Sequence, residues 1–286
     1  MALLVNRGHS GYPAQHCMEA RVSDSPGSGP YSSKIIKASA LLPDTRLLLR
    51  EWDDDADVAA NLGRLHRENA FGKASRSRVE DILSIFRQRY LQDGMILRGL
   101  VTLAKGGMPT GSLDRVLYFL TLKADALLRD VVVVVLAPLL SRGHQDVPIG
   151  EVRRWIEDQV AQGRTERPWG RETVLRVTRG VMATLRDFGV LQGAVQKRLA
   201  PFALPLPAFA FVAYLMYRAT PSGDRLLHHP DWQPFFLSPT AVERLFIEAH
   251  QERLLEYYAA GRVVRLSFPA RTPEEYARVV LTQRAS

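Results

Sequence analysis

Residues 146–204 carry the most informative pattern in the chain: DVPIGEVRRWIEDQVAQGRTERPWGRETVLRVTRGVMATLRDFGVLQGAVQKRLAPFAL. Pro148 suits the first turn of a helix that continues to about Gln162, and Gly163 then ends it. A second, longer helix is expected from about Trp169 to Phe188. The first helix has an apolar stripe at helical spacing, made of Val152, Trp155, Ile156 and Val160.

The second helix separates into an apolar face and a basic face when its residues are placed at helical spacing. The apolar face consists of Val174, Val177, Val181, Leu185 and Phe188. The opposite face holds Arg176, Arg179 and Arg186, with Arg171 at its margin. Gly189 is a typical stop just after such a helix.

A short hairpin is expected directly after this helix. Residues 190–192 and 196–202 form its strands, Gly193 lies in the turn, and Lys197 and Arg198 lie near the tip. These elements follow the order of a winged helix-turn-helix: a helix, a turn, a longer basic helix and a basic wing. Such a domain inserts its second helix into the major groove of DNA. Two other interpretations stay open: a merely solvated helix face, and a winged helix that binds protein.

Charge supports the nucleic-acid interpretation. The chain has a net charge of +8 and a pI near 9.8. Between residues 160 and 200, eight basic residues face three acidic ones, a local net charge of +5. The basic residues are Arg164, Arg167, Arg171, Arg176, Arg179, Arg186, Lys197 and Arg198. Arginine suits phosphates and base edges because its planar fork donates two hydrogen bonds at once.

A second helix-turn-helix candidate precedes this segment. A helix should begin at the acidic run 53–57 and continue to about Asn69, and Ser75 should cap the next helix. That helix has an apolar stripe of Val79, Ile82, Leu83, Phe86 and Tyr90. Arg76 and Arg78 lie at its start, where base-reading residues usually lie, so they are candidate DNA contacts. Simple surface charge explains them equally well.

The remaining sequence predicts a mainly α protein, a helical bundle with winged helix-turn-helix elements and short β-hairpins. Residues 1–33 are rich in Gly, Pro and Ser and are expected to be a disordered tail. An N-terminal helical domain spans 34–140 and includes the five valines 131–135, for which a helix is favoured over a strand. The winged helix-turn-helix spans 141–205, and a helical segment with a short β element spans 206–286. Within the latter, we expect a helix over 240–259 with Tyr258 in its buried stripe, a strand over 263–268 and a helix from Pro273.

Several classes of protein are disfavoured. The single cysteine, Cys17, excludes a disulfide framework and a multi-cysteine metal cluster. No phosphate loop, zinc-ligand spacing or nucleophile elbow occurs, so we expect no catalytic residue, no metal and no cofactor. His228, His229 and Asp231 resemble a site only weakly, because adjacent histidines seldom share one metal. Residues 199–217 lack charge, but three prolines argue against a membrane span, and we expect a cytoplasmic protein.

The chain resembles the BrxA family, a small component of BREX bacteriophage-exclusion systems. The residues that carry the resemblance span about 34–281. They are Trp169, Thr173, Val174, Leu185 through Val190, Trp232, Phe235, Ser238, Gln251, Leu254, Gly261-Arg262-Val263 and Phe268-Pro269. The resemblance implies a mostly helical cytoplasmic protein that works beside a methyltransferase, an ATPase and other BREX proteins to block phage replication. It brings no catalytic motif.

The first functional hypothesis is therefore a non-enzymatic component of a phage-defence system that binds double-stranded DNA. Arg164, Arg167, Lys197 and Arg198 would contact phosphates, while Arg171, Arg176 and Arg179 enter the major groove. One alternative is a protein–protein adaptor whose basic faces meet an acidic surface of another BREX protein. The other is RNA binding, although most aromatic residues fit core positions rather than a stacking surface. Nothing in the sequence predicts the oligomeric state.

Overall fold

The computed structural model describes residues 30–261 and 263–283. Its N-terminal part is helical, as expected. Ser75 caps α3 by accepting a hydrogen bond from the Arg78 amide (3.3 Å), and the stripe from Val79 to Tyr90 is buried. The elements are η1 (Lys34–Ile36), α1 (Leu42–Arg50), α2 (Val58–Arg67), α3 (Arg76–Tyr90), α4 (Gly94–Lys105) and α5 (Thr110–Ala124).

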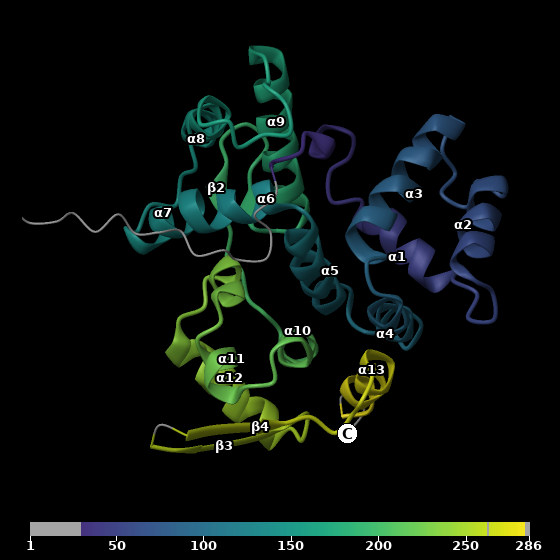
Figure 1. The fold of residues 1–286 in the computed structure, drawn as a ribbon, viewed down its shortest axis with the longest axis vertical. Coiled ribbons are helices and arrows are strands. Elements are labelled where there is room, and N and C mark those ends of the chain that lie inside the picture. Colours follow the sequence, from purple (N-terminus) through teal and green to yellow (C-terminus); the bar gives the residue numbers. More distant parts are fainter. Residues whose placement is uncertain (1–29, 262, 284–286) are drawn as a thin grey trace, which may run out of the picture.

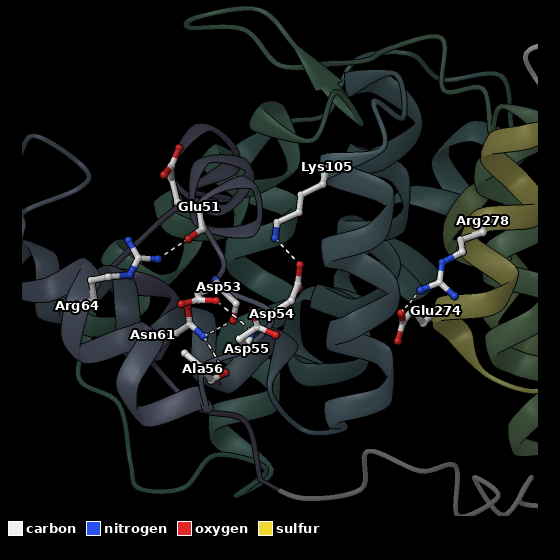
Figure 2. A network of polar contacts seen from close by, with 10 residues as sticks. All are labelled: Glu51, Asp53, Asp54, Asp55, Ala56, Asn61, Arg64, Lys105, Glu274 and Arg278. Carbon is white, nitrogen blue, oxygen red and sulfur yellow. Dashed lines mark hydrogen bonds and ion pairs between the residues drawn. The ribbon is translucent and has the colours of Figure 1, made fainter.

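The acidic run before α2 is a loop rather than a helical turn, which corrects the expected helix start. Only Asp57 adjoins the helix, where its side chain accepts from the Ala60 amide (2.7 Å) as the N-cap. The buried Asn61 folds the loop: its amide group donates to the carbonyls of Asp53 (2.8 Å) and Ala56 (3.1 Å), and its Oδ1 accepts from the Asp53 amide. Figure 2 shows this loop beside the Lys105–Asp54 ion pair. The Asn61 side chain thus bonds to the backbone of residues 53 and 56 in a non-helical conformation, and this holds the segment as a loop.

The valine run is helical, as predicted. It forms the π-helical segment η2 (Val131–Leu136) between α6 (Ala126–Asp130) and α7 (Ala137–Ser141). Val131 and Val132 are fully buried, whereas Val134 is exposed. Tertiary burial on one side thus overrides the extended preference of β-branched residues.

The order of elements in the middle of the chain agrees with the sequence pattern. It comprises α8 (Ile149–Ala161), α9 (Arg171–Asp187), β1 (Leu191–Gln192) and β2 (Arg198–Leu199). Pro148 is the N-cap of α8 rather than its first residue. The strands are shorter than expected and pair antiparallel, with Leu191 opposite Leu199. A third segment joins them, because the Leu199 amide donates to the Gln145 carbonyl (2.7 Å) and the Val147 amide to the Lys197 carbonyl (2.8 Å).

The C-terminal part corrects one expected helix. It comprises α10 (Leu206–Ala219), α11 (Gly223–Leu227), η3 (Pro230–Phe235), α12 (Pro239–Gln251), β3 (Glu256–Ala260), β4 (Val263–Ser267) and α13 (Pro273–Thr282). The predicted helix over 240–259 ends at Gln251, and Arg253 then adopts a positive φ of 56°. Residues 256–260 instead pair with β4, and Tyr258 is 56% exposed rather than part of the core. The partner strand lies later in the chain, so local periodicity could not indicate it.

One continuous core joins these parts. In Figure 1, α1–α3 lie on one side, α8 and α9 at one end, and α10–α13 with β3 and β4 at the opposite end, while α5 runs between them. Aromatic rings fill the centre: Tyr118 lies 5.5 Å from Phe235, and Phe209 lies 5.0 Å from Trp232 and 4.9 Å from Phe246 between ring centroids. No helix in the described ranges is long and apolar enough to cross a membrane.

Residues 30–33, before Lys34, belong to the folded part that the structure describes. Tyr31 is only 2% exposed, and its backbone pairs with the turn between α8 and α9, so the tail boundary predicted at residue 33 is too late. The rest of that predicted tail, residues 1–29, lies outside the described residues. Residues 30–37, here termed the strap, include η1; Tyr31 contacts Trp155 of α8, and η1 packs on α9.

Replacing Gly180 tests this packing. A Cβ at Gly180 would lie 2.9 Å from the Ile35 carbonyl oxygen of the strap. Gly180→Ala should therefore lower the free energy of unfolding by about 1–3 kcal/mol, although Gly→Ala inside a helix normally raises it by up to about 1 kcal/mol. Urea denaturation measures the change. Gly111→Ala in α5 is the control, since a Cβ there meets nothing within 4 Å. A Gly180→Ala variant as stable as this control would contradict the packing.

Candidate nucleic-acid interface

The apolar face of α9 is buried as the sequence predicts. Val177, Val181 and Leu185 are fully buried, and Val174 and Phe188 nearly so. Thr178, Met182 and Thr184 are buried too, so contacts enclose the helix on most of its circumference. What remains exposed is a narrow strip.

That strip is almost entirely basic. The exposed positions of α9 are Arg171, Glu172, Arg176, Arg179 and Arg186, which we term the basic ridge. Among the described residues, no side-chain hydrogen bond or ion pair engages Arg171, Arg176 or Arg179. Three guanidinium groups on one helix face are thus left without an acidic partner, which is a favourable setting for an anion.

A groove of about 620 Å³ runs beside the basic ridge. Its walls are Arg179 and Arg186 of α9, the hairpin turn 194–197, and residues 146–150 at the start of α8. Two apolar side chains protrude at its edges: Val195, 93% exposed, and Ile149, 51% exposed. The structure thus brings three of the ten predicted contacts, Arg179, Arg186 and Lys197, to one concave surface.

The basic residues of the hairpin and of the helix end have internal partners. Arg186 pairs with Asp187 (2.8 Å). Arg198 pairs with Asp146 (3.1 Å). The Lys197 ammonium donates to the carbonyls of Gly193 and Ala194, the latter at 2.8 Å. Their charge is therefore partly compensated inside the chain.

The turn between α8 and α9 holds two predicted contacts in different situations. Arg167 is exposed and its side chain makes no hydrogen bond or ion pair with a described residue. Arg164 donates to Gln159 Oε1 (2.8 Å), lies 3.9 Å from Asp130 and stacks over the Tyr31 ring at 5.0 Å. The Arg164 side chain is thus half-exposed although it has three partners within the chain.

The two candidates on α3 lie away from this groove. Arg76 is exposed at the first position of α3, and the Arg78 side chain donates to the Lys37 carbonyl (2.9 Å). Neither residue lines the groove beside α9. Arg78 therefore joins α3 to the backbone at Lys37, and Arg76 is an exposed basic residue apart from the groove.

Two residues that support the interface were missed in the sequence. Arg115 of α5 donates to the carbonyls of Phe188 (2.7 Å) and Ala203 (2.9 Å), and its guanidinium lies 3.9 Å above the Phe202 ring. It thereby ties the end of α9 and the segment after β2 to the central helix. Burial lowers the pKa of Arg115, although Asp114 opposes this shift, and the group stays charged. Tyr31 is the second missed residue, since nothing periodic surrounds it in the sequence.

Comparison with known proteins identifies the family. A family model described as BrxA matches residues 29–214. The chain belongs to the BrxA family. The resemblance seen in the sequence is therefore confirmed, and the match extends from the strap through the basic ridge into α10. BrxA membership associates the chain with BREX phage-defence systems.

Structural and curated comparisons add little to the BrxA match. A crystal structure of an uncharacterized protein from Magnetospirillum magneticum is similar at 19% sequence identity and a TM-score of 0.49. That similarity covers 66% of this chain and 95% of the other. The search of curated proteins gives no match.

The histidine cluster of this BrxA-family chain has a structural role. His229 caps η3 by accepting the Asp231 amide at Nδ1 (3.1 Å), and Asp231 pairs with Lys123 (3.0 Å). His228 instead lies beside Asp224 (3.7 Å). Within the described ranges, no group of three or more His, Cys, Asp or Glu side chains is arranged to hold a metal.

Removing the hydrogen bonds from Arg115 to the Phe188 and Ala203 carbonyls should destabilise the folded chain. Arg115→Met leaves two carbonyl groups without their donor, so the free energy of unfolding should fall by about 1–3 kcal/mol. Arg115→Lys keeps the charge but cannot reach both carbonyls at once, and should lie between Met and wild type. Urea denaturation ranks the three proteins. A Met variant that unfolds at the wild-type urea midpoint would show that these hydrogen bonds contribute nothing to the free energy of unfolding.

His229 should make stability depend on pH. Burial lowers the pKa of the His229 imidazole below 6.5; Asp231 opposes this shift and Lys123 adds to it. The unfolded chain therefore binds the proton more readily, and stability rises with pH in this window. The contribution of His229 is complete above about pH 6.5 and is lost as pH falls toward the folded-state pKa.

The matched variant is His229→Asn, which can still accept the Asp231 amide but does not titrate. We expect the Tm of the wild type to fall more than that of the variant between pH 7.5 and pH 5, by calorimetry. Parallel Tm curves for the two proteins would rule out this origin of pH sensitivity.

Proposed function

We propose that this chain is a non-enzymatic, duplex-DNA-binding component of a BREX phage-defence system. Residues 141–205 would act as a winged helix-turn-helix, with α9 as the recognition helix and β1–β2 as the wing. The proposed role is binding without catalysis, alongside the methyltransferase, the ATPase and other proteins of the system. We place this role in the cytoplasm, where the phage genome is replicated.

The single observation that carries the proposal is the composition of the exposed strip of α9. Four of its five residues are arginines, and three of these have no partner in the described part of the chain. Three like charges on neighbouring turns repel each other, and an anion beside them relieves that repulsion. A phosphate-lined groove of DNA supplies such an anion, and the major groove is wide enough to admit a helix.

The structure refines which residues we assign to the contact. Arg171, Arg176 and Arg179 protrude from α9 and would enter the major groove. Arg164 and Arg167, in the turn before the helix, and Lys197, in the hairpin after it, would contact phosphates. Arg186 and Arg198 have acidic partners and should contribute less, since part of their charge is already neutralised.

Charge reversal on the basic ridge tests the proposal. We expect Arg176→Glu with Arg179→Glu to weaken duplex binding by at least about tenfold, equivalent to about 1.4 kcal/mol. The reason is that two attractive contacts become repulsive. The measurement is fluorescence anisotropy with a labelled duplex at fixed salt. The matched control is Arg244→Glu with Arg265→Glu, which changes the net charge equally at exposed positions of α12 and β4.

Two outcomes would redirect the assignment. Equal affinities in the folded ridge variant and the control would remove α9 from the interface. Stoichiometric co-purification of a BREX partner without DNA, lost in the ridge variant, would favour the adaptor role instead. Direct competition between duplex DNA and RNA tests the other alternative, RNA binding.

A further inference from the structure

We propose that Tyr31 is a positioning residue for the DNA interface: it holds the turn between α8 and α9 and orients Arg164 toward the duplex. This inference rests on the proposed function and assigns a role to residues outside the helix-turn-helix segment itself. Tyr31 lies on the strap, more than a hundred residues before the turn that it contacts.

The first part of the argument is the backbone. The Tyr31 amide donates to the Arg164 carbonyl (2.8 Å), and the Tyr31 carbonyl accepts from the Glu166 amide (3.0 Å). Tyr31 therefore acts as a one-residue strand beside the turn, in a parallel bridge with Thr165. The turn is thus joined to the strap by two backbone hydrogen bonds, in addition to the bond from the Arg164 amide to the Gln159 carbonyl of α8.

The second part is the phenol side chain. The Tyr31 hydroxyl donates to Asp130 Oδ2 (2.6 Å), and the ring centroid lies 6.1 Å from that of Trp155 in α8. Burial raises the pKa of Tyr31, and the hydrogen bond to Asp130 raises it further, so the hydroxyl remains a donor at any physiological pH. Asp130 is itself fixed by the Arg129 guanidinium (2.9 Å). The ring is therefore locked between α6 and α8.

The third part is Arg164. Its guanidinium lies 5.0 Å above the Tyr31 ring, and its Nη1 is held by Gln159 at 2.8 Å. Half of the side chain is still exposed. A free arginine loses about 2 kcal/mol of rotamer entropy when it is immobilised on a ligand, and an arginine already held on a ring loses less of it. Tyr31 thus prepares Arg164, in the turn before α9, to donate hydrogen bonds to a phosphate oxygen.

The strap also contacts α9. Gly180, one turn after Arg176, allows the Ile35 carbonyl to approach the helix closely beside the basic ridge. The same short segment therefore contacts both the turn and the recognition helix. Displacing it should change how the arginines are presented without removing any of them.

The test is a double-mutant cycle in the full chain. Tyr31→Leu keeps a buried apolar side chain but removes the hydroxyl and the aromatic face, and Arg164→Ala removes the guanidinium. We expect each variant to bind duplex about fivefold more weakly, and the double variant to remain at about fivefold, because both changes remove the same contact. Independent effects would instead multiply to about 25-fold. Tyr31→Phe, which keeps the ring under Arg164, should restore most of the affinity.

A second readout does not depend on DNA. Hydrogen exchange at the Glu166 amide, which donates to the Tyr31 carbonyl, should be faster in Tyr31→Leu than in wild type. Tyr258→Leu is the matched control, since Tyr258 is an exposed tyrosine on β3. It should leave both the affinity and the exchange rate unchanged.

The outcomes are separable. If the wild type binds duplex and Tyr31→Leu binds equally well, or if the effects multiply, the positioning role is overturned while DNA binding stands. Unchanged exchange at Glu166 in Tyr31→Leu would overturn it as well. If the wild type does not bind duplex, the proposed function fails and this role fails with it.

Discussion

Burial of the apolar face of α9 fixes the direction of every exposed side chain on that helix. Val177, Val181 and Leu185 are fully enclosed, and the close approach of the strap at Gly180 prevents the helix from rolling. Because these contacts fix the rotation of the helix, its arginines face solvent on the side that the core leaves uncovered. The groove beside the hairpin exists for the same reason, since its floor is the side of α9 that the core leaves uncovered.

The proposed interface also depends on charge that the described part of the chain does not neutralise. Some exposed basic groups elsewhere have local acidic partners, as in the Lys105–Asp54 and Glu274–Arg278 pairs of Figure 2. The basic ridge differs because it places three guanidinium groups without a partner in the described residues on one helix. Like charges without partners lower the free energy of unfolding slightly. Binding of an anionic partner relieves this repulsion, so such a cluster is typical of an anion-binding surface. The proposed function gives that partner a chemical identity, a phosphate backbone.

The sequence predicts the helical parts well because their signals are local. The stripes of α3, α8 and α9 depend on residues three and four positions apart, and glycines at 163 and 189 mark the helix ends with positive φ. The errors come from contacts between distant segments. Residues 256–260 become a strand only because β4 follows, and Tyr31 is ordered only because the turn near Arg164 accepts it. Counting charges indicated the segment that holds the basic ridge. It could not separate Arg176, which has no partner among the described residues, from Arg198, whose partner Asp146 lies before α8.

The most direct test of the account is the salt dependence of duplex binding by the wild-type chain. If the unpaired arginines of α9 and its turn neutralise phosphates, the logarithm of the affinity falls linearly with the logarithm of the salt concentration. The slope should be near −0.9 for each phosphate contacted, and about −3 or steeper for three or more contacts. An affinity that does not change with salt, or no binding at low salt, would contradict the account and assign the basic ridge to a protein partner.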